Sequence, residues 1–456
     1  MSLHIGSSNI SDIYVGNSKI SDIYVGNDLV YTSNKGPDLT VPLYFEANDP
    51  TEACTVKFEL AQASEFSEAV STLNTTYFPS LTPPDWAYSY DGRSWTAYTI
   101  DTNISIGGAN PARVFFKTLT DYTGTQPWCT SYTEKGDKLD VVYFSFTHAV
   151  ITGSVAAMGN IQSLVAVDFA NRTSVPNNAF MHLFTGCTSL TSAPLLPATA
   201  AGYRNYFYMF SNCTALTEVP MLSATEIDYE AARGMFCNCT ALTSAPDLQT
   251  TSKVGYYGYA YMFKGCTALT SAPALPATTL GINSYNYMFQ GCTALTSAPS
   301  LPATTLADSC YAAMFSGCTS LVEAPSLPAT TLAGSCYNGM FTGCTALTSA
   351  PALPATTLAN FCYLNMFQDC TALTSAPSLP ATTLVSGCYS SMFSRSIRAN
   401  STASAPCVYP YRIPESGTGT DGDPTGLSSM FANIDGTGNF TPTINTTFYI
   451  SVPVMS

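Results

Sequence analysis

Cysteines that recur at a fixed interval are the first candidates in this chain for disulfide bonds or metal binding. They open eight copies of one sequence between Phe184 and Phe393, at positions 187, 213, 239, 266, 292, 318, 344 and 370. In a stacked fold, neighbouring copies bring such cysteines to about 5 Å, within reach of a disulfide bond. Each cysteine would then have two equivalent neighbours, His partners are missing, and no C-x₂-C pair occurs, so disulfides and metal sites are disfavoured. We interpret the cysteines as buried free thiols that act as small apolar side chains, and no cofactor is expected.

Carboxylates are the second group that could do chemistry, and they are sparse in the repeats. Between Cys266 and Phe393 the charged residues are Asp308, Glu323 and Asp369 alone. Cleavage of a glycosidic bond generally needs two carboxylates about 5 to 9.5 Å apart, whereas these three stand at unrelated positions of their copies. The pair in Asp421-Gly422-Asp423 could hold Ca²⁺, but two acids among glycines are more typical of a turn. His148, at the end of an expected strand, is interpreted as structural. We therefore predict no catalytic residue, no metal ligand and no enzymatic activity.

The repeat itself predicts the elements that carry these residues. A period of about 26 residues is typical of a solenoid, in which each coil buries its apolar face against the next. Leu295 to Leu301 is expected to form a short strand in a parallel ladder, kept brief by two prolines. Asp308 to Phe315 is expected to be a helical turn or a 3₁₀ piece. The inward-facing core of one coil is predicted to consist of Leu295, Leu301, Leu306, Met314 and Phe315.

A tyrosine stands three residues before the Met of most Met-Phe pairs and is expected to form an aromatic ladder at one edge of the solenoid. One interpretation is packing with a hydroxyl at the rim. The other is a platform on which sugar rings stack, since an aromatic face with a polar tip suits glycans. The candidate surface-binding residues are Tyr285, Tyr311, Tyr337, Tyr363 and Tyr389. The two residues between Tyr and Met vary among copies, as in Ala312-Ala313 and Asn338-Gly339, which is typical of an outer surface.

Composition limits the class of protein and its partners. The chain has 456 residues, of which 46% are hydrophobic and only 10% charged, as expected for a folded, β-rich protein. Its net charge of −14 disfavours nucleic acid and an anionic membrane surface as partners. It has no apolar run of 18 residues, so no membrane span is expected. The start, Met1 to Gly6, has neither a basic nor an apolar segment, and no signal peptide is predicted.

A second, shorter repeat opens the chain. Ile10 to Asn17 reads ISDIYVGN and recurs as Ile20 to Asn27. The Gly-Asn pairs are turn signals between short strands, which are too small to hold a core alone. This predicts a segment that docks to a partner or pairs in an oligomer, the alternative being the edge of the next domain. The candidate docking residues are Ile13, Tyr14, Val15, Gly16, Ile23, Tyr24, Val25 and Gly26.

The rest of the chain divides by pattern. Strands are expected at 41–46, 86–90, 95–100 and 141–146, with Asp91-Gly92 as a hairpin turn, and together they predict a β-sandwich-like domain. After the regular copies the period is lost, and Leu427 to Phe431 looks like one last worn copy inside a cap. The predicted fold is mainly β, and its parts are a docking segment at 1–33, a β-sandwich-like domain at 34–165, a leucine-rich-repeat solenoid at 166–396 and a C-terminal degenerate repeat and cap at 397–456.

The repeat resembles the BspA-like (Treponema-type) leucine-rich repeat of bacteria, which reads approximately Cys-x-x-Leu-x-x-Ile-x-Leu-Pro and then Ala-Phe-x-x-Cys. The matching residues are Cys292, Leu295, Ala298, Leu301, Pro302 and the pair Met314-Phe315. The copies depart from it in their 26-residue length, in Ala-Pro where Ile is usual, and in a second Cys at 310, 336, 362 and 388. The resemblance covers about half the chain. It implies adhesion and ligand binding at cell surfaces by exported proteins.

The doubled opening segment is similar to the start of virion proteins from tailed phages of gut Bacteroidetes. There such a segment precedes variable distal domains, which implies attachment to the particle. The resemblance covers about 30 residues and agrees with the expected lack of a signal peptide, because phage proteins assemble in the host cytoplasm.

Together these features predict an oligomeric phage appendage, a head or tail fibre. Its N-terminus would dock to capsid or tail proteins, and its solenoid would bind a host surface protein or glycan. The first alternative is a bacterial cell-surface adhesin of the same repeat class. The second is a glycan depolymerase, which the scattered carboxylates disfavour.

Overall fold

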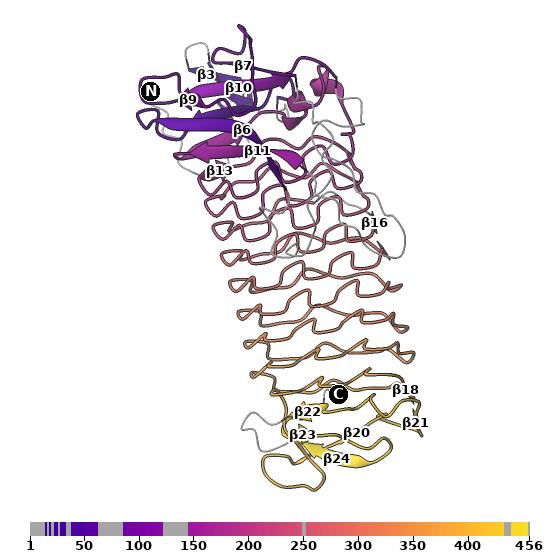
Figure 1. Ribbon diagram of the computed structural model, residues 1–456. Coiled ribbons are helices and arrows are strands. Elements are labelled where there is room, and N and C mark those ends of the chain that lie inside the picture. Colours follow the sequence, from indigo (N-terminus) through magenta and orange to yellow (C-terminus); the bar gives the residue numbers. More distant parts are fainter. Residues whose placement is uncertain are drawn as a thin grey trace.

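The computed structural model describes residues 14–15, 18–19, 22–25, 28–32, 38–62, 85–121, 145–248, 252–432 and 439–454. Within this part the chain is mainly β, as predicted, and its helices are the 3₁₀ helices η2 (Ile161–Leu164) and η3 (Phe169–Asn171). Figure 1 shows an elongated molecule with broad strands at one end, thin coils stacked through the middle and short strands at the other end. In the described ranges no helix is long and apolar enough to cross a membrane.

The opening repeat contains two antiparallel strand pairs. β1 (Tyr14–Val15) pairs with β2 (Ser18–Lys19), and β3 (Asp22–Val25) pairs with β4 (Asp28–Thr32). Val15 faces Ser18, and ten residues later Val25 faces Asp28, so both copies pair at the same point of the repeat. Of the candidate docking residues, those at 13, 16 and 26 lie outside the described residues. The docking role stays a prediction.

Two sheets follow. The first has the order β13-β12-β5-β10-β7-β8, and the second has the order β11-β6-β9. Their neighbours are antiparallel except for the parallel pair β12 and β13. The strands of the first sheet are β5 (Tyr44–Ala47), β7 (Trp86–Ser89), β8 (Thr96–Ala97), β10 (Arg113–Thr118), β12 (Val155–Met158) and β13 (Leu190–Ser192). Those of the second sheet are β6 (Cys54–Gln62), β9 (Ile104–Ile106) and β11 (Ser145–Thr152).

The predicted hairpin around Asp91-Gly92 is confirmed, since β7 pairs with β8. Its turn is held by the Asp91 carboxylate, which accepts the backbone N–H groups of Arg93 and Ser94 at 2.8 and 2.7 Å. These bonds lower the pKa of Asp91, first through Ser94 and then through Arg93. The strand expected at 141–146 is described only in its last two residues, which begin β11.

The two sheets share one core. The ring of Phe58 on β6 lies 4.8 Å from Trp86 and 5.1 Å from Phe116, both on the first sheet. The indole N–H of Trp86 donates to the carbonyl of Leu164 in η2 at 3.0 Å, which satisfies its buried donor. His148 is buried in β11 with Nε2 3.5 Å from a carboxylate oxygen of Glu59, in keeping with a structural role.

From residue 307 to residue 318 the coil is a run of overlapping turns rather than the expected helical turn. The N–H of Met314 donates to the carbonyl of Tyr311, three residues back, at 3.2 Å. The next N–H, that of Phe315, donates instead to the carbonyl of Met340 in the following coil at 2.9 Å. Because alternate amides point along the stack, each coil is hydrogen-bonded to its neighbour through this segment.

The backbone follows this path because residues with positive φ angles recur every four positions. In this coil they fall at Ser309 (54°), Ala313 (51°) and Gly317 (74°). Such a conformation costs roughly 1–2 kcal/mol for a side-chain-bearing residue other than Asn or Asp, and nothing for Gly. The third position accordingly is a Gly, Asn or Asp in most coils: Gly186, Asn212, Asn238, Gly265, Gly291, Gly317, Gly343 and Asp369. As a result, residues 310–312 and 314–315 are buried, whereas 313, 316 and 317 are partly exposed.

Equivalent side chains stack from coil to coil. Neighbouring Phe rings lie 5.2 to 5.8 Å apart, and all are nearly parallel within the regular coils. The stack consists of Phe184, Phe210, Phe236, Phe263, Phe289, Phe315, Phe341, Phe367, Phe393 and Phe431. Of the predicted core residues, Leu295, Leu301, Met314 and Phe315 are fully or almost fully buried, and Leu306 packs partly buried against them.

The strand expected at 295–301 is not present, but neighbouring coils are still paired in parallel there. Neighbouring coils touch there through single bridges, such as that between Ser297 and Glu323. Pro299 and Pro302 have no N–H to donate, which limits the pairing to one residue per coil. A parallel sheet forms instead further along the earlier coils, from β14 (Ala200–Ala201), β15 (Glu226–Ile227), β16 (Lys253–Val254) and β17 (Thr279–Leu280).

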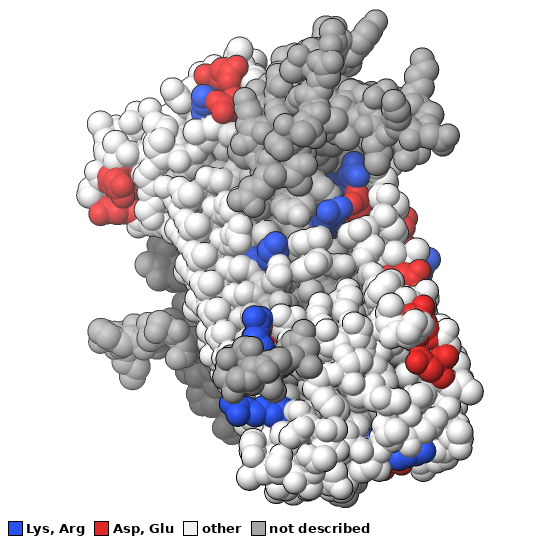
Figure 2. Space-filling view, turned by 60° about the horizontal axis from the view of Figure 1, so that its bottom comes forward, with Lys and Arg blue, Asp and Glu red and all other residues white. Residues whose placement is uncertain are grey.

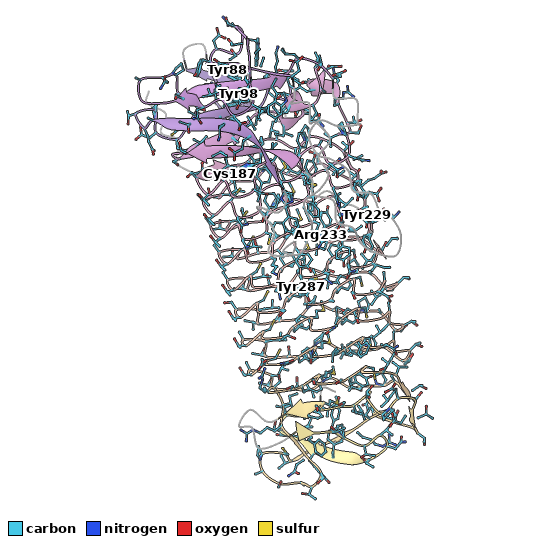
Figure 3. The ribbon with its side chains drawn as sticks, viewed as in Figure 1. Tyr88, Tyr98, Cys187, Tyr229, Arg233 and Tyr287 are labelled. Atoms are coloured by element: carbon cyan, nitrogen blue, oxygen red, sulfur yellow. The ribbon has the colours of Figure 1, made fainter. Side chains whose placement is uncertain are left out.

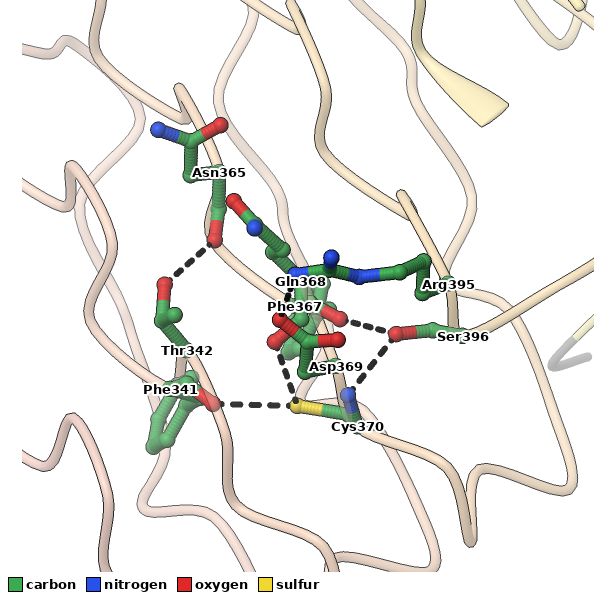
Figure 4. A network of polar contacts seen from close by, with 9 residues as sticks. All are labelled: Phe341, Thr342, Asn365, Phe367, Gln368, Asp369, Cys370, Arg395 and Ser396. Atoms are coloured by element: carbon green, nitrogen blue, oxygen red, sulfur yellow. Dashed lines mark hydrogen bonds and ion pairs between the residues drawn. The ribbon is translucent and has the colours of Figure 1, made fainter. Parts of the chain in front are cut away.

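The described cysteines are all free and buried, as predicted, and Cys129 lies outside the described residues. The structure adds a reason for their recurrence. The thiol of Cys318 donates to the carbonyl of Phe289 in the preceding coil at 3.1 Å, and the equivalent thiols do the same along the stack. In the last such position Ser396 replaces Cys, and its hydroxyl donates to the carbonyl of Phe367 (Figure 4).

Short strands close the far end. The worn copy continues the stack, since Phe431 lies 5.4 Å from Phe393, and the N–H of Phe393 donates to Met430. Phe440 and Phe448 then cover the Phe431 ring at 6.3 and 5.7 Å. The strands here are β18 (Thr383–Leu384), β19 (Ala399–Asn400), β20 (Tyr409–Arg412), β21 (Thr420–Asp421), β22 (Phe431–Ala432), β23 (Asn439–Phe440) and β24 (Thr447–Ile450).

Candidate binding surface

The five tyrosines predicted as a surface row do form a ladder, but the ladder is inside the stack. Their rings lie 5.7 to 5.9 Å apart and are nearly parallel. The prediction that they bind a ligand at the surface is wrong, because Tyr285, Tyr311, Tyr337, Tyr363 and Tyr389 are each no more than 1% exposed. The four-residue period explains this, since each tyrosine stands four residues before a buried Phe and therefore points inward with it.

The two residues between each buried tyrosine and the next Met vary among the coils. The first of them is itself buried at Ala260, Asn286 and Ala312, and the second is partly exposed in most coils. In the later coils the second of them is small or polar: Ala313, Gly339, Asn365 and Ser391. In the earlier coils it is most often aromatic, namely His182, Tyr208, Tyr261 and Tyr287, with Gly234 between them. A Cβ atom on Gly234 would lie 2.4 Å from the ring of Tyr208, so the close approach of that ring requires glycine.

Aromatic rings and cations alternate over this part of the stack. The guanidinium of Arg233 lies 4.6 Å from the ring centre of Tyr257 and 5.3 Å from that of Tyr261. The ammonium of Lys264 lies 5.5 Å from the same Tyr261 ring and 5.9 Å from Tyr287. Each such contact stabilises by roughly 0.5–1 kcal/mol at an exposed site. We call this surface the cation–aromatic strip, which consists of Tyr203, Arg204, Phe207, Tyr229, Glu230, Arg233, Tyr256, Tyr257, Tyr261, Lys264 and Tyr287.

Three cations come from three successive coils, each further along its coil than the last. In Figure 3, Tyr229, Arg233 and Tyr287 lie on a diagonal across the stack. Figure 2 shows that the face in view is mostly uncharged, with Lys and Arg in scattered groups along it. From residue 265 to residue 394 the sequence holds neither Lys nor Arg, so the strip is confined to the earlier coils.

A buried carboxylate organises the two arginines. Glu230 is 3% exposed and forms ion pairs with Arg204, at 2.5 Å, and with Arg233. Burial alone would lower the pKa of Arg233, but Tyr208 and Glu230 raise it above its ordinary value, so the guanidinium stays charged. One carboxylate thus faces two arginines, and with Lys264 the strip carries an excess of two positive charges.

Three tyrosines form the most exposed edge of the strip. The ring of Tyr229 stacks between Tyr203 at 5.2 Å and Tyr256 at 4.6 Å. Tyr229 and Tyr256 are 38% and 36% exposed. Burial, with the nearby charge of Glu230, raises the pKa of Tyr229 to about 12, so its hydroxyl is a donor at neutral pH. Since the ring faces cover each other, these tyrosines present edges and hydroxyls to solvent.

Three aspartates that lie outside the strip make structural contacts. Asp308 accepts the N–H of Gly334 at 2.8 Å, and Asp369 pairs with Arg395 at 2.5 Å (Figure 4). Asp423 accepts the N–H of Thr425 at 2.8 Å, within a turn. In the part of the chain that the structure describes, no three His, Cys, Asp or Glu side chains gather as a metal site. Burial lowers the pKa of His182 to about 3, so this histidine is neutral at physiological pH.

Comparison with known proteins gives one match. The family model described as BspA type leucine rich repeat region matches residues 140–270 and 259–398, in six copies. No curated protein and no solved structure matches the chain.

Proposed function

The chain belongs to the BspA-type leucine-rich-repeat family, and from this membership we propose that it is a binding protein displayed to a host-surface protein or glycan. The stacked coils form a solenoid in this proposal, and a β-sandwich-like domain at 34–165 supports it. Facing rings such as Phe58 and Phe116 support the sandwich, and the shared ladders of Phe and Tyr support the solenoid.

The cation–aromatic strip carries the proposal. The outward positions of the regular copies are mostly Ala, Ser, Thr, Asn and Gly, which keep the coils soluble and need no further explanation. The strip departs from that pattern with tyrosine and arginine, the residue types enriched at binding interfaces. It does so in four adjoining coils, with two tyrosines more than one-third exposed.

For the location, we propose a phage virion, in which the protein is an oligomeric head or tail fibre. The docking segment at 1–33 would attach it to capsid or tail proteins. Its resemblance to the opening of phage virion proteins supports this. So does its size, because isolated two-stranded pairs such as β3 and β4 are marginally stable and gain from pairing with a partner.

The second candidate is a bacterial cell-surface adhesin, which the family match favours because that repeat class is associated with adhesion. In both candidates the solenoid binds the ligand. They differ in whether a phage particle or a bacterial cell surface carries the protein. For neither do we propose an enzymatic activity, since Asp308 and Asp369 are engaged in structural contacts.

Immunogold electron microscopy of the native source material, with antibody against residues 34–456, separates the two candidates. Gold on the capsid or tail of phage particles is the expected result. Gold on cell envelopes, with unlabelled particles, would contradict the phage appendage and favour the cell-surface adhesin. Gold on neither surface would contradict a displayed binding protein.

A further inference from the structure

We infer that the cation–aromatic strip binds an acidic saccharide, a chain of sugar rings that each carry one carboxylate. This inference rests on the proposed function and names the chemical class of its ligand.

The charge of the strip is opposite to that of the protein. The whole chain carries a net charge of −14, whereas the strip holds Arg204, Arg233 and Lys264 against the single carboxylate of Glu230. Lys264 is partly exposed and forms no ion pair with any residue that the structure describes, and its ammonium lies over two tyrosine rings. A ligand carboxylate can therefore pair with Lys264 without displacing an existing partner, and its attraction is strengthened by the excess charge of the arginine pair.

The other exposed groups suit a sugar. Tyr229 and Tyr256 present ring edges and phenol hydroxyls, and the hydroxyl of Tyr229 stays protonated at neutral pH. Phenol hydroxyls donate and accept hydrogen bonds, as the hydroxyls of a sugar do, while the ring edges contact its apolar face. The exposed edge thus offers hydrogen bonds beside the cations, which a saccharide can use and an aliphatic ligand cannot.

The small number of cations favours a ligand with few charges over a dense polyanion. Successive coils contribute one cation each, and each cation stands further along its coil than the last, so the three do not follow the ~4.8 Å step between neighbouring strands. Duplex DNA carries a negative charge about every 1.7 Å and is bound by many cations at once. Three cations on an acidic protein, two of them paired with Glu230, provide too little charge for nucleic acid, whereas they suit a short run of sugar rings with one carboxylate each.

Titration calorimetry of the full chain at low ionic strength tests the inference with a galacturonate hexamer. The matched ligand is the same hexamer with every carboxylate methyl-esterified, which removes the charge and keeps the sugars. We expect binding of the acid form and not of the ester. In Lys264→Gln the Kd of the acid form should rise about fivefold, which corresponds to ~1 kcal/mol.

Lys264 is the residue to change, because replacing either arginine would leave the buried Glu230 carboxylate short of a partner. Lys264→Arg should keep the affinity. Arg395→Gln, which removes a cation paired with Asp369 outside the strip, should leave binding unchanged. Thermal unfolding of each variant at the wild-type temperature shows that the coils are intact.

Equal binding of the acid and ester forms, an unchanged Kd in Lys264→Gln, or no binding of the acid form would overturn the inference. So would equally tight binding of a single-stranded DNA hexamer, which would make the strip a general anion site. The proposed function fails separately: a protein displayed on particles or envelopes that ignores the galacturonate hexamer keeps its binding role and loses only this ligand.

Discussion

Phe315→Ala tests whether the stacked rings stabilise the coils. Phe315 is fully buried, and its ring lies 5.7 Å from Phe289 and 5.8 Å from Phe341. Truncation of such a ring costs roughly 3–5 kcal/mol, because it loses apolar burial and leaves a cavity. This cost includes the loss of two stacked ring pairs, each of which contributes about 0.5–1.5 kcal/mol. The free energy of opening the coils around residue 315 should fall by this amount.

Hydrogen exchange followed by mass spectrometry is the suitable assay, because each coil contacts only its neighbours and opens locally. Peptides that span 285–345 should exchange about 100-fold faster or more in the variant, since each 1.4 kcal/mol is a factor of ten. Peptides from the sheets, such as 54–62, should exchange as in the wild type. Thr305→Ala, at an exposed position of the same coil, is the matched control. Wild-type protection of 285–345 in Phe315→Ala would refute the account of the core.

Three further predictions concern other features of the coils and the opening segment. Cys344→Ser should cost about 0.5–1.5 kcal/mol less stability than Cys344→Ala in chemical denaturation, because the serine hydroxyl still donates to the Phe315 carbonyl, whereas alanine leaves that carbonyl with the hydrogen bond from the Cys318 N–H alone; equal costs would remove the role given to the thiol. Gly343→Asn should leave the stability of the protein nearly unchanged, whereas Gly343→Val should lower it by ~1–2 kcal/mol, because φ is 74° at this position. Thermal unfolding measures the difference. A valine variant as stable as the wild type would contradict the backbone strain. Removal of residues 1–33 should leave a soluble protein with an unchanged melting temperature that no longer attaches to particles, while loss of folding would make this segment part of the β domain.

The inward core could be predicted from the sequence because every copy repeats it. Leu295, Met314 and Phe315 return in register, and a residue that must be apolar in eight copies is buried in each. The sequence pattern wrongly predicts the repeated tyrosines at the surface, because the run of turns that contains them follows neither the helix period of 3.6 nor the strand period of 2. Its period of four is set by positive φ angles, and the signal for it in the sequence is the Gly, Asn or Asp two residues after most of the repeated Phe residues, such as Gly317.

The cation–aromatic strip could not be found by comparing equivalent positions of the copies. Arg204, Arg233 and Lys264 stand at three different positions of their coils, and only stacking brings their side chains onto one diagonal. One signal was available, because these three residues and Lys253 are the only cations between 173 and 394. An excess of tyrosine in the same coils, outside the repeated Tyr position, pointed the same way.

Binding of the labelled full chain to cell envelopes from its native source tests the central claim most directly. Sedimentation with the envelopes should be saturable for the wild type and for Arg395→Gln. It should be weaker for a protein that carries Tyr256→Leu together with Lys264→Gln, two changes within the cation–aromatic strip. Equal sedimentation of all three proteins, or none of the wild type, would contradict the claim that this chain binds a surface through the strip.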